Sequence, residues 1–194
     1  AGSMSDLATR LEAIVRADPD LMTVLEGVRA EGLNDWLIFS GAIYQSVWNH
    51  LTGRPPGHGI KDFDVGYFDP DYSWDAEDAV IRRVAARFDE PLRSRVEVRN
   101  QRRVAEWFPQ KFGQPWPPVG ATAEALSRFG APAFAVGVRL EPDDRLTVEA
   151  PFGLGDMFAM VLRPNPTRPL AADWDRVVDK LVARWPELKV ERER

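Results

Sequence analysis

The sequence predicts an α/β fold: a single domain in which a mixed sheet of about five strands is flanked by helices. Short apolar runs that end at glycine, proline or serine alternate with segments whose apolar residues recur at helical spacing. The 194 residues, 44% of them hydrophobic, suffice for one good core and are marginal for two domains. We therefore expect one domain over residues 5–190, with residues 1–4, Ala-Gly-Ser-Met, as the remnant of a tag.

The segment 5–32 is expected to form one or two helices that serve as scaffold. Its apolar residues fall at helical spacing on both sides of an Ala-Asp-Pro-Asp break. Within that break, Asp18 is suited to cap a second helix and Pro19 to occupy its first turn.

Residues 36–69 are the segment around which the rest of the prediction is organised. Residues 36–39 form a short apolar run typical of a buried strand, and Ser40-Gly41 ends it. Residues 42–51 carry an apolar face at helical spacing, and a loop rich in glycine and proline follows. Residues 62–68 then predict a second strand.

Two acids on that second strand indicate chemistry. Asp62 and Asp64 are two residues apart, so their side chains point to the same face of the strand. They repel each other unless a hard cation lies between them, and Mg²⁺ (or Mn²⁺) prefers carboxylate oxygens. The Ser40-Gly41 turn offers backbone N–H groups at a helix N-terminus, where a phosphate is favoured. Metal-binding carboxylates beside a phosphate site are suited to phosphoryl or nucleotidyl transfer.

The same residues resemble a known superfamily. Gly41-Ala42 at the start of a helix, followed by Asp62-Phe63-Asp64-Val65, is similar to the signature of the DNA-polymerase-beta-like nucleotidyltransferases. Residues 47–51, 55–62, 96–101 and 150–153 more narrowly resemble a bacterial family of nucleotidyltransferase-like proteins of unknown function. Two features depart from the superfamily pattern: Ala42 stands where Gly or Ser is usual, and the connection from Gly41 to Asp62 is longer than usual.

The resemblance implies a metal-dependent enzyme that moves a nucleoside monophosphate from an NTP to an acceptor and releases pyrophosphate. It names no acceptor, which could be RNA, a protein or a small molecule. The expected site residues are Asp62, Asp64 and Glu97 for catalysis and metal binding, and Ser40, Gly41, Lys61 and Arg99 for the nucleotide.

A third strand is expected at residues 93–101, where Arg95, Glu97 and Arg99 share one face. Such a face is often simply solvated, with its charges paired across strands. The resemblance favours Glu97 as the third metal carboxylate, because the superfamily supplies its third acid from a later strand beside the Asp-x-Asp strand. Glu149, on another expected strand, is the rival for this role.

A local excess of positive charge follows the second strand. Residues 82–111 carry nine basic and four acidic residues, a balance that suits a triphosphate or an RNA backbone. Arg99 and Lys111 are the candidate phosphate contacts, although arginines on an exposed helix face are the ordinary alternative. His58, in the loop before Lys61, either contacts a phosphate or holds the loop.

Most of the remaining segments predict scaffold, whereas the Pro/aromatic loop at 106–118 could shape a base or acceptor pocket. Asp69 and Asp71 precede a helix and are expected to serve its capping rather than to bind metal. The further expected elements are a helix at 76–88, a Pro/aromatic loop at 106–118, a short helix at 121–129 capped by Thr122, a hairpin of strands at 133–140 and 146–150, a short helix at 153–160 and a terminal helix at 174–185.

Composition excludes several classes of protein. The chain has no cysteine, which rules out disulfides and thiolate metal sites, and its two histidines lack zinc-site spacing. No apolar run is long enough to span a bilayer, and the net charge of −5 argues against a duplex-DNA binder. We expect a cytoplasmic protein whose partners are an NTP and an acceptor, with neither a membrane nor duplex DNA among them.

Two other functions stay open at this point. A catalytically inactive nucleotide- or partner-binding pseudoenzyme is supported by Ala42. A glycosyltransferase would also use Asp-x-Asp to hold a metal and a nucleotide diphosphate, but it needs a nucleotide-sugar domain for which this chain is short.

Overall fold

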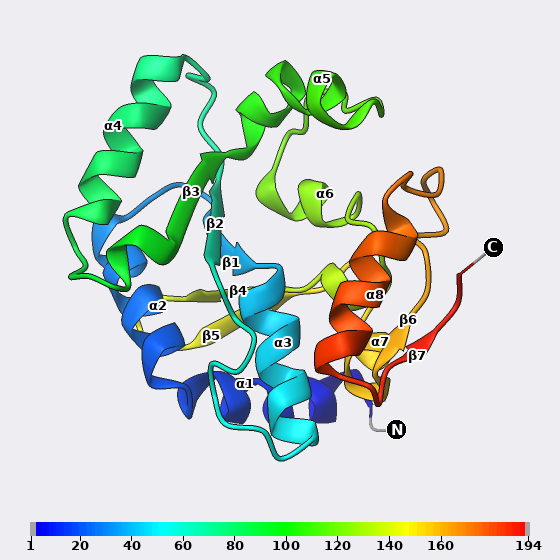
Figure 1. Ribbon diagram of the computed structural model, residues 1–194. Helices are drawn as coiled ribbons and strands as arrows, with labels where there is room; N and C mark the ends of the chain where they lie inside the picture. The colour runs from blue at the N-terminus through cyan, green and yellow to red at the C-terminus, as the bar shows by residue number, and fades with distance from the viewer. Residues whose placement is uncertain (1–2, 193–194) are drawn as a thin grey trace.

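The computed structural model describes residues 3–192, which fold around a mixed five-stranded sheet of order β3-β2-β1-β4-β5 (Figure 1). The pairing of β2 with β3 is parallel, and the other three pairings in the sheet are antiparallel. A separate parallel pair joins β6 to β7. The strands are β1 (Leu37–Phe39), β2 (Phe63–Tyr67), β3 (Val96–Asn100), β4 (Gly137–Leu140), β5 (Leu146–Glu149), β6 (Val161–Leu162) and β7 (Lys189–Val190).

Helices pack on the sheet, and further helices lie beside it. Helix α1 packs on α2, α3 and α7, while α2 packs on β4 and α4 packs on β3. Helices α5 and α6 lie on the same side of the sheet as α8, at the right of Figure 1. The helices are α1 (Met4–Arg16), α2 (Pro19–Glu31), α3 (Gly41–Leu51), α4 (Trp74–Ala85), α5 (Phe108–Phe112), α6 (Thr122–Leu126), α7 (Gly155–Ala159) and α8 (Trp174–Arg184).

This architecture confirms the predicted fold class, a mixed α/β sheet of five strands flanked by helices. Asp18 accepts a hydrogen bond from the backbone N–H of Leu21, and Pro19 occupies the first turn of α2, as predicted. The β4–β5 hairpin is also confirmed. The predicted tag remnant at 1–4 lies partly outside the described residues, and the Ser3 side chain accepts a hydrogen bond from the Asp6 N–H at the start of α1.

Three local predictions were wrong. Residues 93–95 form a 3-10 turn rather than the start of a strand, so Arg95 lies outside β3 and its guanidinium donates to the carbonyls of Ile60 and Lys61. Thr122 is the first residue of α6 and not its cap. The expected 106–118 loop contains helix α5, which a proline in its first turn favours.

The core holds α3 rigidly against the sheet. Trp48 is fully buried and its indole N–H donates to the carbonyl of Met157, 3.0 Å away. Trp185 donates in the same way to the side-chain oxygen of Asn49, which ties α3 to the end of α8. Because buried indoles with satisfied N–H groups pack at fixed geometry, the N-terminus of α3 is held in one place. None of the helices between residues 3 and 192 combines the length and apolarity needed to cross a bilayer.

Candidate active site

The turn before α3 is built on Ser40. Its backbone has φ 63° and ψ −145°, a region that glycine adopts readily and other residues do not. Gly41 begins the helix, as predicted, and does not have this conformation; within the predicted Ser40-Gly41 turn, Ser40 carries the positive φ. A Cβ on Gly41 would meet the side chain of Gln45 at 3.0 Å. The start of α3 lines the same pocket as Asp62 and Asp64, and the free backbone N–H groups of a first helical turn favour anions.

Asp64 stands beside this helix end. It pairs across the sheet with Phe39 of β1 on one side and with Glu97 of β3 on the other. Residues in register on neighbouring strands share a face, so Asp64 and Glu97 project together. Asp62 lies just before the first residue of β2 and is exposed.

The electrostatic environment of Asp64 is unusual for an acid. Burial raises its pKa from 3.8 to about 7, and the negative charges of Glu97 and then Asp62 act in the same direction. A hydrogen bond between Asp64 and Glu97 requires a proton on one of the two carboxyls. The Ser40 hydroxyl donates to Asp64 and opposes the rise. Within residues 3–192, no basic side chain forms an ion pair with Asp64.

Asp64 therefore interacts with both of the other predicted acids, Glu97 and Asp62. Asp64 and Asp62 line one pocket, and Asp64 and Glu97 line another. In the part of the chain that the structure describes, no group of three acidic or histidine side chains forms a ready-made metal site. The role of Asp62, Asp64 and Glu97 in binding a metal remains a prediction.

The first of these pockets is rich in basic residues. This cationic pocket, about 360 Å³, is lined by the start of α3, the two aspartates and one face of α8. Arg176, Lys180 and Arg184 are spaced four apart on α8, so their side chains lie on the same face, opposite Lys61. The positive charge of Lys61 is the largest influence on Lys180 and lowers its pKa.

Such a cluster is well suited to an anion, because basic groups that repel one another gain from a shared negative ligand. Lys61 was predicted from sequence as a nucleotide contact, whereas no functional role was predicted for α8. The spacing of Arg176, Lys180 and Arg184 was visible in the sequence, yet a basic helix face is usually only solvated.

The second pocket lies on the β3 side of Asp64. This Glu97 pocket, about 200 Å³, is also lined by Arg99 and by the ring of Trp107. The guanidinium of Arg99 lies over the Trp107 ring at 5.3 Å. Arg99 is thus beside the acids, where its charge can reach a ligand near Glu97.

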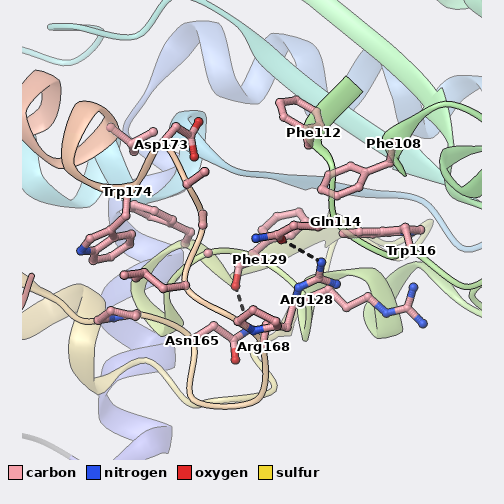
Figure 2. Close-up of a pocket in the computed structure, with 18 of the residues that line it drawn as sticks. Phe108, Phe112, Gln114, Trp116, Arg128, Phe129, Asn165, Arg168, Asp173 and Trp174 are labelled. Atoms are coloured by element: carbon pink, nitrogen blue, oxygen red, sulfur yellow. Dashed lines mark hydrogen bonds between the residues drawn. The ribbon is translucent and has the colours of Figure 1, made fainter. Parts of the chain in front are cut away.

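A third and larger pocket adjoins both, and one of its walls comes from the 106–118 segment that was expected to shape a base or acceptor pocket (Figure 2). This aromatic pocket, about 670 Å³, lies between α5, the 114–116 segment and the start of α8. It shares Ser40 and Tyr44 with the cationic pocket, and Phe108 and Phe129 with the Glu97 pocket. Lys111, a predicted phosphate contact, lines this pocket instead of either smaller one.

Other candidates lie away from Asp64. Glu149 is in the same row of side chains but three strands along, roughly 14 Å from Asp64 at ordinary strand spacing. The carboxylate of Asp69 accepts from the backbone N–H of Asp71, and that of Asp71 accepts from Ser73, which caps α4, so these acids build the turn as expected. His58 stacks edge-on against Trp185 at 5.7 Å and holds its loop.

Comparison with known proteins finds solved structures of similar fold. An NMR structure described as revealing a CCA-adding enzyme head domain is 25% identical, with a TM-score of 0.74 over 94% of both chains. Two structures of a tRNA-processing enzyme, an apo form and a complex, are each 19% identical with TM-scores of 0.50 and 0.51; the match covers 87% of this chain and 45% and 43% of theirs. A comparison with curated proteins finds no match.

The two tRNA-processing structures are more than twice as long as the part that matches, and at this identity they show the shared fold alone. The family model for nucleotidyltransferases matches residues 26–190, which include the turn at Ser40, all three acids and the basic face of α8. The chain therefore belongs to the nucleotidyltransferase family.

Proposed function

We propose that the protein transfers a nucleoside monophosphate from an NTP to an acceptor hydroxyl and releases pyrophosphate. The observation that carries this proposal is Asp64, an acid crowded by other acids, beside a helix N-terminus and a basic pocket. A folded chain gains nothing from such repulsion, so the arrangement is favoured only with a ligand that supplies positive charge to the acids and negative charge to the bases.

The triphosphate would lie in the cationic pocket. The backbone N–H groups at the start of α3, from Gly41 on, would donate to phosphate oxygens. Lys61 and the α8 side chains Lys180 and Arg184 would neutralise the β- and γ-phosphates from the opposite wall. The Ser40 hydroxyl already donates to Asp64 and would keep that carboxylate oriented.

The acids fit a hard divalent cation by their chemistry. Asp62, Asp64 and Glu97 offer only carboxylate oxygens, and their mutual repulsion would be relieved by positive charge. They would hold Mg²⁺ (or Mn²⁺), which in nucleotidyl transfer stabilises the charge that develops on the phosphate oxygens.

The acceptor would enter from the β3 side. Its hydroxyl oxygen would form a bond to the α-phosphorus while the bond from that phosphorus to the bridging oxygen of the β-phosphate breaks, and pyrophosphate would leave with that oxygen. Glu97, exposed at the edge of the Glu97 pocket, would take the hydroxyl proton. Arg99 beside it would bind an anionic group of the acceptor.

RNA is the first acceptor to test. Two structural neighbours are tRNA-processing enzymes, and a third is a CCA-adding enzyme head domain. The pocket that contains Glu97, Arg99 and Trp107 combines a carboxylate, a guanidinium and an aromatic ring, which suits the end of a single-stranded RNA.

The test is transfer of label from an α-³²P-NTP, with pyrophosphate release measured in parallel. Purified protein is incubated with Mg²⁺ and, in separate reactions, with total tRNA, a protein extract and a small-molecule extract. We expect label on one fraction, its loss with EDTA and its loss in Asp64→Asn. Glu141→Gln, an acid outside all three pockets, is the matched control and should keep activity. NTP binding without pyrophosphate release in any fraction would instead indicate a pseudoenzyme.

A further inference from the structure

The aromatic pocket has two walls that face each other. Phe108 and Trp116 lie 4.5 Å apart between ring centroids, and Phe112 stacks on Phe108 at 4.8 Å. On the other side Phe134 lies 4.7 Å from Tyr44. Figure 2 shows Phe108, Phe112 and Trp116 on one side of the pocket and Trp174 on the other. Aromatic walls of this kind favour a flat aromatic ligand, which stacks on them.

The walls are fixed by hydrogen bonds before any ligand arrives. Asn165 donates to the carbonyls of Ser127 and Phe129, at 2.8 and 2.7 Å. Arg168 donates to the carbonyl of Pro115 and to the side-chain oxygen of Gln114, at 3.1 and 3.2 Å. Because these bonds join segments far apart in sequence, the pocket is preformed and a ligand need not order it.

The polar groups of the pocket are mostly donors. Arg168 lies over the Trp116 ring at 5.1 Å, and so does Arg128 from the C-terminal side of α6. Burial lowers the pKa of Arg168, and the charge of Arg128 adds to the effect. Gln114 uses its oxygen for Arg168, which leaves its amide NH₂ to donate to a ligand. Such donors suit the carbonyl and ring-nitrogen acceptors on the edge of a nucleobase.

The aromatic pocket is continuous with the cationic pocket. Ser40 and Tyr44 from the start of α3 line both pockets, and so do Arg176 and Val177 from α8. One ligand can therefore extend from the basic groups to the aromatic walls past the first turn of α3. The volume of the aromatic pocket, about 670 Å³, is in the range of small-molecule sites.

We infer that the aromatic pocket binds the nucleobase of the donor NTP, whose triphosphate lies in the cationic pocket. This inference rests on the proposed function and assigns the selection of the nucleotide to the C-terminal half of this same chain. Phe112 and its neighbours stack on the base, and Gln114 with Arg168 donates to its edge.

Calorimetry with two kinds of probe tests the assignment. The first probe is inorganic tripolyphosphate, which fills the cationic pocket alone. The second is the set of four α,β-methylene NTP analogues, which cannot lose pyrophosphate. Phe112 is 47% exposed, so Phe112→Ala leaves the fold intact. We expect this variant to lower the affinity for the tightest-binding analogue by about 5- to 30-fold, the effect of losing one stacked ring. Its affinity for tripolyphosphate should be unchanged.

Three further variants complete the test. Lys180→Gln should weaken the binding of both probes, because it removes a positive charge from the cationic pocket. Trp74→Ala, an exposed aromatic side chain on α4 outside all three pockets, should change neither. Gln114→Ala should alter the order of affinity among the four bases.

The outcomes separate the two proposals. If the wild type binds tripolyphosphate but Phe112→Ala leaves every analogue unaffected, the base lies elsewhere and this inference is overturned while the proposed function stands. Equal loss of both probes in Phe112→Ala also overturns it, since the ring would then act on the phosphates. If neither probe binds the wild type, the proposed function and this inference fail together.

Discussion

Two acids on the same face of the sheet, one on β2 and one directly after β4, have opposite surroundings. Asp64 on β2 and Glu141 at the end of β4 each accept a hydrogen bond from a hydroxyl, that of Ser40 and of Thr147 respectively. Glu141 also accepts from Arg139 at 2.9 Å, and its pKa is lowered, chiefly by Thr147. Asp64 has no such partner; burial and neighbouring acids raise its pKa to about 7.

The comparison distinguishes an acid whose charge stabilises the fold from an acid whose charge is available to a ligand. The charge of Glu141 is already balanced within the chain, so nothing further is gained by binding there. Asp64 is left with a charge that only an external cation or a proton can balance. Substitutions of the two acids should therefore change stability with opposite sign as well as different size.

The largest expected effect is the loss of turnover when Glu97 is replaced, compared with replacement of Glu149, the glutamate that lies on the same face of the sheet farther from Asp64. Glu97→Gln should lower turnover by about 100-fold or more, because it removes the proposed proton acceptor beside Asp64. Glu149→Gln, in the same row but three strands along, should stay within about twofold of the wild type. The assay is initial rate of pyrophosphate release. Equal losses in the two variants would mean that closeness to Asp64 is irrelevant to the reaction.

The next effect is on stability, and its sign follows from the raised pKa. Because the pKa of Asp64 is higher in the folded protein than its ordinary value of 3.8, protonation favours folding, and this contribution is lost as pH rises through about 7. Without metal, Asp64→Asn should therefore match the wild type near pH 4 and exceed it at pH 8 by about 2 kcal/mol, a figure reduced from the full shift because Asp64 is partly exposed.

Urea unfolding in EDTA at both pH values measures this difference. Adding Mg²⁺ at pH 8 should stabilise the wild type and leave Asp64→Asn unchanged, because only the wild type offers the full set of carboxylates. A variant that is less stable than the wild type at pH 8 would show that the Asp64 charge is already balanced within the folded chain.

Much of this site could be predicted from sequence, and the reason is local. Ser40, Gly41, Asp62 and Asp64 lie within one strand–helix–loop–strand segment, residues 37–67, where alternation and breakers fix which residues share a face. Glu97 was placed next to Asp64 only through the family resemblance, because no local pattern shows which strand a given strand pairs with; the β2–β3 register confirms that placement.

The parts that sequence could not give depend on tertiary contacts. The basic face of α8 becomes a wall of the cationic pocket only because Trp185 and Asn49 fix α8 against α3. The aromatic pocket joins α5 to the 164–174 segment through Arg168, across more than fifty residues. The identity of Ser40 as the turn residue was also hidden, since composition favours Gly41 for a positive φ.

A smaller effect tests Ser40 itself, the hydroxyl partner of Asp64. Its positive φ is strained for a residue with a Cβ, so Ser40→Gly should be more stable than Ser40→Ala by about 1 kcal/mol. Both variants lose the hydroxyl that donates to Asp64 and should lose activity to the same extent. Thermal unfolding and turnover measure the two effects separately. Higher activity in Ser40→Gly than in Ser40→Ala would mean that the backbone, and not the hydroxyl, is what the reaction needs.

The smallest effect is that of replacing Glu141, the acid whose charge is balanced within the chain. Glu141→Gln keeps the shape of the side chain but removes the charge that Arg139 and Thr147 stabilise, so it should lower stability at pH 7 by about 0.5 kcal/mol. Because the Glu141 pKa is lowered, its contribution is present above the ordinary value of 4.5 and is lost as pH falls through the folded value. The variant and the wild type should therefore converge in acid, whereas Asp64→Asn and the wild type diverge as pH rises. Urea unfolding at pH 7 and pH 3 measures the difference in stability between the variant and the wild type. If Glu141→Gln were instead more stable than the wild type at pH 7, the charge of Glu141 would be unbalanced within the chain, like that of Asp64.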